Sequence, residues 1–233
     1  MPAIAVKGLT KSFGSHLALR GVEFRVEAGE AVVIFGPNGA GKTTLIKILA
    51  TIMNPSSGEV IINGLTTRDN AEKIRRGIGV ITHQTFLYSN LTAFENLDFY
   101  CRLYDVPRPR ERIEEVAATV DMTSRLHDRI GTLSRGMQQR LSIARALLHG
   151  PSILLLDEPE TGLDQQAVAI LRQAVTVEKG GRRTVVLTTH NLERGLELSD
   201  RLLILARGKI VFEKTTRTLD LSGLKEAYHQ YTG

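Results

Sequence analysis

LSRGMQQRLSIARALLHGPSILLLDEP, residues 133–159, carries a predicted helix, a predicted buried strand and two adjacent carboxylates. Ser134 is of a type preferred at helix N-caps, and apolar residues then recur at helical spacing until a glycine–proline pair ends the helix. Ile153–Leu156 is wholly apolar, which is typical of a strand inside a parallel sheet. Helix N-termini bind anions, and acidic strand ends such as Asp157-Glu158 hold Mg²⁺ or steer a water. Both ends of the stretch therefore indicate phosphate chemistry.

A second motif for phosphate binding lies upstream, after the apolar run Ala31–Phe35, which we predict to be a strand. Residues 36–43, GPNGAGKT, fit the pattern G-x-x-x-x-G-K-[ST], and a predicted helix follows. The glycines let backbone N–H groups curl round phosphates, Lys42 can reach the β and γ oxygens, and the Thr43 hydroxyl can ligate Mg²⁺. Taken alone, this loop leaves kinases, GTPases and motor ATPases open. The residues predicted to bind the phosphates are Gly36, Pro37, Asn38, Gly39, Ala40, Gly41, Lys42, Thr43 and Thr44.

Together the two motifs resemble the ATP-binding cassette (ABC) family, with a match from about Val6 to Phe212. The resemblance implies ATP and Mg²⁺ as cofactors. It assigns Asp157 to the metal together with Thr43, and Glu158 to the general base that activates the attacking water. His190 matches the switch histidine that contacts the γ-phosphate.

Five further positions take their expected roles from the same resemblance. Phe13 matches the aromatic that stacks on adenine, although an aromatic at a strand end can equally be ordinary packing. Gln84 matches the glutamine that senses Mg²⁺ and the attacking water and couples to the transport partner. Asp164 lies in the loop that signals across the dimer. Ser134 and Gly136 match the residues that meet the γ-phosphate held by a second copy.

The signature motif of the family differs from its usual sequence in this chain. It usually reads Leu-Ser-Gly-Gly-Gln, whereas this chain has Leu133-Ser134-Arg135-Gly136-Met137. The serine and the second glycine are retained, and Arg135 adds positive charge near a phosphate site. Met137 replaces the glutamine that contacts the ribose, with Gln138 beside it.

The resemblance implies an α/β fold: a P-loop NTPase (ABC ATPase) core with an antiparallel β subdomain and an inserted α-helical subdomain. We expect one domain over residues 1–233, with 1–85 and 151–233 forming the core and its antiparallel sheet. Residues 86–150 are expected to form the helical subdomain with the signature motif. Within it, Thr92–Glu95 has the pattern of a capping box at a helix start.

Composition agrees with a single peripheral cassette. The chain has 233 residues, 42% hydrophobic and 24% charged, and no apolar run reaches the roughly 18–20 residues of a membrane helix. No signal segment precedes the first predicted strand, and the single cysteine, Cys101, excludes an internal disulfide and fits a reducing cytosol. The net charge of +5 is spread along the chain, so we expect no nucleic acid partner. The expected location is the cytoplasmic face of the cell membrane.

Aromatic residues concentrate in one part of the expected helical subdomain. Of the twelve phenylalanines and tyrosines, six fall between positions 86 and 104. In ABC ATPases this region forms the groove for a coupling helix of the membrane subunit, while a packed lobe core is the alternative. We expect some to pack and some to line the groove. The six are Phe86, Tyr88, Phe94, Phe99, Tyr100 and Tyr104.

Three classes of function compete: the ATPase subunit of a membrane transporter, a soluble ABC ATPase, and a plain P-loop enzyme such as a small-molecule kinase. A kinase does not explain the signature residues 133–136, and the chain shows neither two cassettes nor a long coiled-coil insertion. The transporter subunit is therefore expected. Its expected partners are ATP, one or more membrane-spanning subunits, and a second copy bound head to tail.

The cargo is suggested by closer resemblance only. Four stretches, residues 81–88, 91–97, 134–140 and 189–196, look like the ATPase of the heme exporter complex of cytochrome c maturation. Similar stretches of sequence occur among multidrug, lipid and sodium efflux ATPases. The expectation is ATP-driven export across the cytoplasmic membrane, with heme as the cargo and these other efflux cargoes as alternatives.

Overall fold

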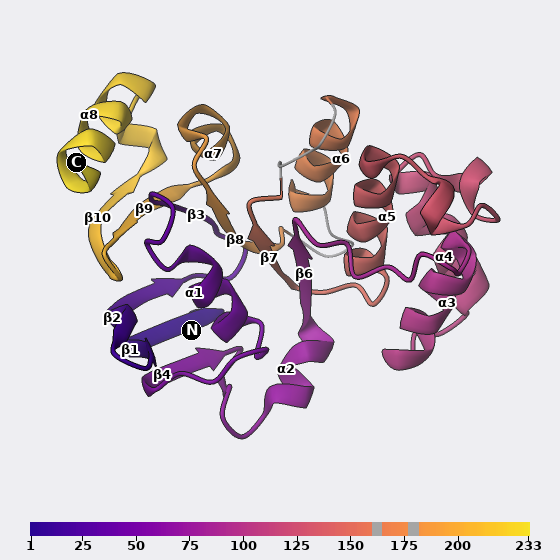
Figure 1. Cartoon of the computed structure of the whole chain (residues 1–233), viewed down its shortest axis with the longest axis horizontal. Helices are drawn as coiled ribbons and strands as arrows, with labels where there is room; N and C mark the ends of the chain where they lie inside the picture. Colours follow the sequence, from indigo (N-terminus) through magenta and orange to yellow (C-terminus); the bar gives the residue numbers. More distant parts are fainter. Residues whose placement is uncertain (160–164, 177–181) are drawn as a thin grey trace.

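Two β-sheets and the helices around them make up the described part of the computed structural model, residues 1–159, 165–176 and 182–233 (Figure 1). The smaller sheet is antiparallel, with the order β2-β1-β4-β5, and lies at the N-terminal end of the chain. This agrees with the antiparallel β subdomain predicted from the sequence. Its strands are β1 (Ile4–Phe13), β2 (His16–Val26), β4 (Ser57–Ile62) and β5 (Leu65–Thr66).

The larger sheet has six strands in the order β10-β9-β3-β8-β7-β6. All neighbours are parallel except β10, which runs antiparallel to β9 at one edge. Every residue of β3 and β7 is buried, as expected for parallel strands covered on both faces. The strands are β3 (Ala31–Phe35), β6 (Ile78–Thr82), β7 (Ile153–Asp157), β8 (Thr184–Thr189), β9 (Arg201–Ala206) and β10 (Lys209–Thr215).

Helices cover both faces of this sheet, and α3, α4 and α5 lie together at the end of the molecule away from the N-terminal sheet (Figure 1). The α-helices are α1 (Lys42–Leu49), α2 (Ala71–Gly77), α3 (Ala93–Leu103), α4 (Pro109–Thr119), α5 (Arg135–Leu147), α6 (Gln165–Thr176), α7 (Leu192–Leu198) and α8 (Leu221–Thr232). Short 3₁₀ helices are η1 (Thr123–Arg125), η2 (Ile130–Thr132) and η3 (Thr216–Thr218).

Successive side chains of a buried strand point to opposite faces of the sheet, so the apolar interior consists of two cores, one on each face. In β7, Leu154 and Leu156 join the core that includes buried residues of α3, α4, α5 and α8. Ile153 and Leu155, on the opposite face, join the core shared with α1 and the antiparallel sheet. Each strand therefore needs apolar residues at every position, and the continuous apolar runs in the sequence are explained.

Local signals in the sequence are confirmed at two helix starts. Thr92 and Glu95 form the expected capping box at α3. At α5, the Ser134 hydroxyl accepts a hydrogen bond from the Met137 amide at 3.3 Å. Two helices of seven residues each, α2 and α7, were not predicted from periodicity, because a helix of two turns carries too few apolar positions to show a period.

The observed arrangement confirms the predicted fold class: a P-loop α/β core, an antiparallel sheet and a group of helices between β6 and β7. The proposed division into residues 1–85 with 151–233 and residues 86–150 stays a prediction. Among the helices that the structure describes, none has the length and hydropathy needed to cross a membrane.

Candidate nucleotide-binding site

The loop between β3 and α1 has the backbone geometry that its glycines predict. Gly41, the N-cap of α1, has φ 109°, and a Cβ there would lie 2.6 Å from the carbonyl oxygen of Ala18. A Cβ on Gly36 would lie 2.3 Å from the carbonyl oxygen of Leu205. Neither position accepts a side chain, so the loop curves tightly and begins a helix whose first N–H groups point out of its N-terminus. Such a helix start favours a bound anion.

Lys42 lies at the centre of this loop. Its side chain is only 5% exposed, and its ammonium donates hydrogen bonds to the carbonyl oxygens of Gly36 at 2.7 Å and Pro37 at 3.2 Å. The same Nζ lies 3.3 Å from Oε1 of Glu158. The sequence predicts that Lys42 reaches phosphate oxygens, and the structure places its charge beside the proposed catalytic carboxylate.

One residue of β8, Thr188, bonds both acidic residues at the end of β7: the side chain of Asp157 and the backbone of Glu158. Thr188 lies opposite Asp157 in the parallel register, and its Oγ1 donates a hydrogen bond to Asp157 Oδ1 at 2.7 Å. Its carbonyl oxygen accepts the amide N–H of Glu158 at 2.9 Å. Glu158 has φ 45°, a left-handed conformation that is uncommon for a non-glycine residue. Thr188 was not among the predicted site residues, because only the pairing of the two strands identifies it.

Glu158 also lies close to His190, the residue predicted to be the switch histidine. Its Oε2 lies 3.7 Å from Nδ1 of His190, which follows β8 and is two-thirds exposed. The carboxylate of Glu158 is 29% exposed, whereas Asp157 is buried. Three residues predicted from separate motifs, Lys42, Glu158 and His190, are therefore brought together at the carboxyl ends of β3, β7 and β8.

A cavity of about 390 Å³ lies over this loop, within the roughly 300–1,000 Å³ typical of small-molecule sites. Phe13 lines it and is 47% exposed, with Lys11 Nζ 5.3 Å from its ring centroid. An exposed ring at the cavity wall agrees with a stacking surface and not with core packing. The lining is Phe13, His16, Ala18, Asn38, Gly39, Gly41, Lys42, Thr43, Thr44, His83, Asp157 and Glu158, of which His16, Ala18 and His83 were not predicted.

Other predicted residues lie elsewhere. Gln84 lines a separate cavity of about 640 Å³ together with Arg135, at the start of α5. Ser134 and Gly136, at the same helix start, are not among the residues that line the cavity over the P-loop. Asp164 lies outside the described residues, so the structure says nothing of its predicted role.

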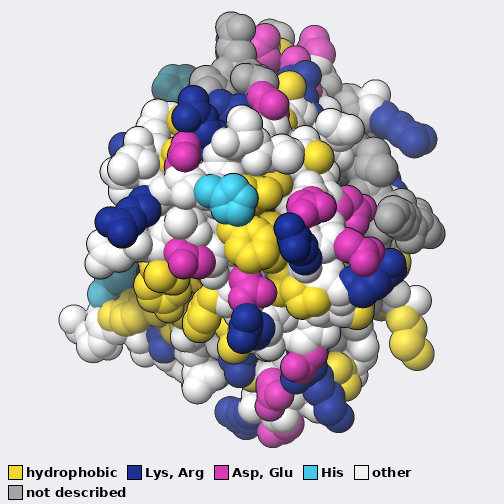
Figure 2. Space-filling model, turned by 90° about the vertical axis from the view of Figure 1, so that its right-hand side faces the viewer, with side chains coloured by type: hydrophobic (Ala, Val, Ile, Leu, Met, Phe, Trp, Pro, Cys, Tyr) yellow, Lys and Arg dark blue, Asp and Glu magenta, His cyan; other side chains and the backbone are white. Residues whose placement is uncertain are grey.

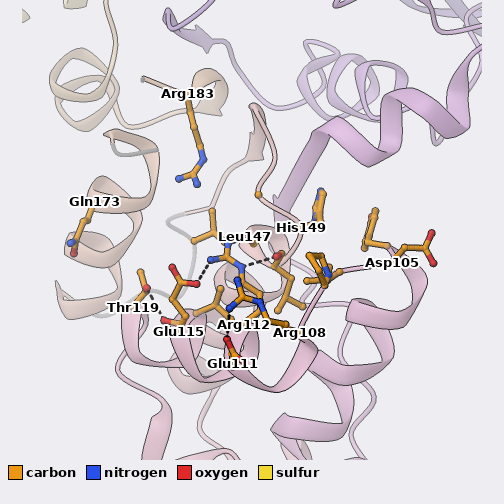
Figure 3. A pocket seen from close by; sticks show the side chains of 16 residues that line it. Asp105, Arg108, Glu111, Arg112, Glu115, Thr119, Leu147, His149, Gln173 and Arg183 are labelled. Atoms are coloured by element: carbon orange, nitrogen blue, oxygen red, sulfur yellow. Dashed lines mark hydrogen bonds and ion pairs between the residues drawn. The ribbon is translucent and has the colours of Figure 1, made fainter. Parts of the chain in front are cut away.

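A further cavity, of about 620 Å³, lies between α4 and the C-terminal end of α5 (Figure 3). Its lining includes none of the residues predicted for ATP. The arginines in it are engaged: Arg108 pairs with Glu111, and Arg112 pairs with Glu115, each at 2.8 Å. Arg112 also donates to the carbonyl oxygens of residues 147 and 148 at the end of α5. These contacts tie α4 to α5, and we assign no ligand to this cavity.

The residues over the P-loop fit ATP and Mg²⁺ chemically. A buried ammonium and the N–H groups of a helix start suit phosphate oxygens, while the Thr43 hydroxyl and the Asp157 carboxylate are oxygen ligands of the kind Mg²⁺ prefers. Within the described ranges, no group of three or more His, Cys, Asp or Glu side chains could hold a metal alone.

Known proteins are similar in sequence to this chain over most of its length. The family model described as ABC transporter matches residues 19–161. The ABC transporter ATP-binding protein NatA of Bacillus subtilis (strain 168) is 36% identical over 205 residues, covering 87% of this chain and 83% of NatA. The daunorubicin resistance ATP-binding protein DrrA3 of Streptomyces coeruleorubidus is 35% identical, covering 93% and 68%. Nod factor export ATP-binding protein I of Rhizobium sp. (strain N33) is 34% identical, covering 93% and 72%.

Solved structures agree with the sequence relatives. An ATP-binding subunit of an ABC transporter has a TM-score of 0.89 and 29% identity, covering 97% of this chain and 99% of its own. The ATP-binding cassette MJ0796, solved as a dimer in a post-hydrolysis state with ADP and Pi, has a TM-score of 0.84 and 31% identity, covering 93% and 100%. With a P-loop, two strand-end carboxylates and a histidine in one place, this chain belongs to the ABC transporter family as an ATP-binding subunit, an ATPase coupled to transport.

Proposed function

We propose that this chain hydrolyses ATP over the β3–α1 loop and thereby drives export by a membrane transporter. One observation carries the catalytic part: Glu158 lies between Lys42 and His190, beside an Asp157 carboxylate that Thr188 fixes. A general base needs an accessible carboxylate near the phosphate site, and Glu158 is the more exposed of the two acids.

Each residue has a defined task in this proposal. Lys42 and the amides of the loop bind the phosphates, and Thr43 with Asp157 would hold Mg²⁺, which neutralises phosphate charge when bound. Glu158 accepts the proton of the attacking water, and His190 orients the γ-phosphate beside it. Phe13 stacks on the adenine from the antiparallel sheet. Gln84 is assigned to sensing the metal and the water.

Assembly is the second part of the proposal. Ser134 and Gly136 begin α5, and the cavity over the P-loop does not include them. A head-to-tail pair of copies would bring each α5 start to the γ-phosphate on the other copy, where the helix dipole of about half a positive charge favours ATP over ADP. Asp164 is proposed to lie near that interface. The related cassette MJ0796 is dimeric, which supports a dimer of this chain.

The aromatic residues after Gln84 divide into two groups. Phe94, Tyr100 and Tyr104 pack against the core, whereas Phe86, Tyr88 and Phe99 are 42–52% exposed. Figure 2 views the side of the molecule where α3, α4 and α5 lie, and shows hydrophobic side chains near the middle of this face, bordered by charges of both signs. We assign the three exposed aromatics to the contact with a membrane-spanning subunit on the cytoplasmic side.

The cargo is proposed from the relatives' names. One relative is named for daunorubicin resistance and another for Nod factor export, so we propose an efflux cargo of the drug or Nod factor type. Heme, expected from four short stretches of sequence, gains no support from the relatives reported above, and we do not retain it as the proposed cargo. Co-purification with a polytopic membrane protein separates this proposal from a soluble, non-transport ABC ATPase.

The test of assembly uses Glu158→Gln, which should bind ATP without hydrolysing it. We expect light scattering to show a monomer without nucleotide and a dimer with MgATP. Ser134→Arg in the same background should remain monomeric with MgATP, because the larger charged side chain blocks the approach of the helix start to the second copy. Dimerisation of the Ser134→Arg protein to the same degree as its parent would show that the head-to-tail arrangement is wrong.

A further inference from the structure

Strand β6 ends the larger sheet, and side chains from one helix cover its free edge. Alternate carbonyl oxygens of an edge strand point outward, where a neighbouring strand would otherwise donate to them. Here three side chains from α5 and the residue after its C-cap donate instead. The contacts are Gln139 Nε2 to Thr82 O at 2.9 Å, Arg145 Nη2 to Val80 O at 2.7 Å and His149 Nε2 to Ile78 O at 2.9 Å.

Arg145 differs from the other two because it also contacts aromatic rings. Its guanidinium carbon lies 5.2 Å from the ring centroid of Tyr100 and 5.5 Å from that of Phe86, both within cation–π range. The Tyr100 hydroxyl donates a hydrogen bond to the backbone carbonyl of Phe86 at 2.7 Å. Phe86 is therefore held at its ring by Arg145 and at its backbone by Tyr100.

Burial of this charge is unfavourable for stability. Arg145 is 8% exposed, burial lowers its pKa, and its Nε is a buried atom with no hydrogen-bond partner among the described residues. A methionine of similar length would fill the same space without burying a charge or an unpaired donor. Methionine would supply neither the hydrogen bond to Val80 nor a positive charge between the two rings.

The segment held by Arg145 connects the predicted nucleotide-sensing glutamine to the exposed aromatic face. The hydroxyl of Thr82 accepts from the amide of Gln84 at 3.0 Å and donates to its carbonyl at 2.9 Å. At the other end, Asn96 Oδ1 accepts from the amide of Tyr88 at 2.7 Å. Phe86 lies between these two anchors with φ 54°, in the left-handed region. A non-glycine residue keeps that conformation only where its surroundings hold it.

We propose that Arg145 is a positioning residue, which holds the ring of Phe86 and so fixes the Gln84 loop relative to β6. The proposal rests on the function proposed above, since the task of Gln84 at the nucleotide is part of it. Arg145 is not among the residues that line the cavity over the P-loop. It acts through two contacts: its hydrogen bond to the edge strand, and its charge between two rings, one of which belongs to the loop.

The test compares Arg145→Met with Arg145→Lys. Arg145→Met should lower kcat about tenfold, because a loop that is misplaced by a fraction of an ångström no longer aligns its glutamine, while Kd for ATP without Mg²⁺ stays within about twofold. Arg145→Lys keeps a cation between the rings and should recover part of kcat. The chain contains no tryptophan, so Phe86→Trp gives a single reporter. When Arg145→Met is added, acrylamide should quench the fluorescence of this tryptophan more strongly, because its ring is held less firmly.

His149→Phe is the matched control, because it removes a hydrogen bond to the same edge strand and retains a ring that can stack on Tyr104. It should lower stability without changing kcat or the quenching of Trp at position 86. Equal kcat and equal quenching in Arg145→Met and His149→Phe would overturn the proposal. If Arg145→Met does not fold, Arg145→Lys and Tyr100→Phe replace it, and unchanged kcat in both would overturn it. Failure of the wild-type chain to bind or hydrolyse ATP would instead overturn the proposed function.

Discussion

Two groups of polar side chains on the larger sheet differ in what they contact: one lies at the carboxyl ends of β3, β7 and β8, and the other along the free edge of β6. At the strand ends, Lys42, Asp157 and Glu158 line a cavity, and Glu158 keeps a partly exposed carboxylate. Along the edge, Arg145 and Gln139 donate to backbone carbonyls. The first region presents charge to a ligand, and the second replaces a missing strand. Similar residue types therefore serve chemistry in one place and architecture in the other.

The largest difference between the two regions should appear in catalysis. Glu158→Gln removes the proposed base and leaves the shape of the cavity almost unchanged, so ATP binding should persist. Turnover should fall by on the order of 10²–10⁴, the usual contribution of a positioned general base. Phosphate release under saturating MgATP measures turnover, and equilibrium binding of a fluorescent ATP analogue measures affinity.

Lys42→Ala supplies the contrast within the same cavity. It removes the ammonium that donates to Gly36 and Pro37, so it should weaken nucleotide binding itself and not turnover alone. Turnover at the wild-type rate in Glu158→Gln would show that another group activates the water.

A smaller effect is expected from Thr188, which is fully buried and does not line the cavity over the P-loop. Thr188→Val keeps the volume of the side chain and removes the hydroxyl that donates to Asp157. Loss of such a supporting contact typically weakens metal binding about 10–100-fold. Titration of Mn²⁺ in the presence of ATP, followed by electron paramagnetic resonance in the Glu158→Gln background, should show this weakening.

Thr188→Ser is the control for that measurement because it restores the hydroxyl. Its Mn²⁺ affinity should return towards the parent value, while ATP binding without metal should be the same in all three proteins. Equal Mn²⁺ affinity in Thr188→Val and its parent would show that the hydroxyl does not position Asp157.

The two regions also differ in how far the sequence predicts them. The P-loop spans eight consecutive residues, and the helix caps at Thr92 and Ser134 involve neighbours three positions away, so local patterns were sufficient. The Thr188–Asp157 hydrogen bond joins residues 31 apart, and the bond from Arg145 to Val80 joins residues 65 apart. Such pairs depend on which strands are neighbours and where α5 packs. A motif is visible in one sequence, but a contact across elements follows only from the fold.

The aromatic residues after Gln84 show the same limit. Their concentration between positions 86 and 104 is visible in the sequence, and the structure confirms that some of them pack, while the groove for a membrane subunit stays a prediction. The sequence does not predict which of these residues pack and which are exposed, because the face of α3 that meets the core depends on α4 and α5. Tyr100 is partly buried and its neighbour Phe99 is exposed, and that packing decides the difference.

The smallest expected effect concerns the pH dependence of stability at the edge of β6. His149 donates to Ile78 and stacks on Tyr104, with ring centroids 4.1 Å apart and an interplanar angle of 7°. Burial lowers the pKa of His149 below its usual 6.5, and the positive charges of Arg145 and Arg112 act in the same direction. As the pH falls, the His149 side chain therefore takes up a proton more readily in the unfolded chain than in the folded one. The free energy of unfolding should fall as pH drops below about 6.5, by no more than about 1.4 kcal/mol per pH unit, the slope for one proton.

Urea denaturation of the wild-type chain and His149→Phe at pH 7.5 and pH 5.5 measures this contribution, since both values bracket the pKa of an unfolded histidine at roughly 6.5. The variant loses the hydrogen bond to Ile78 at both pH values, so its stability is lower throughout. Its loss on acidification should nevertheless be smaller than that of the wild type, because the group that resists the proton is gone and the other titrating groups are shared. Equal losses in the two proteins would show that His149 accepts its proton as readily in the folded chain as in the unfolded one. The effect is small because it concerns one proton on a side chain that contacts the sheet edge, whereas Glu158 is the proposed base of every turnover.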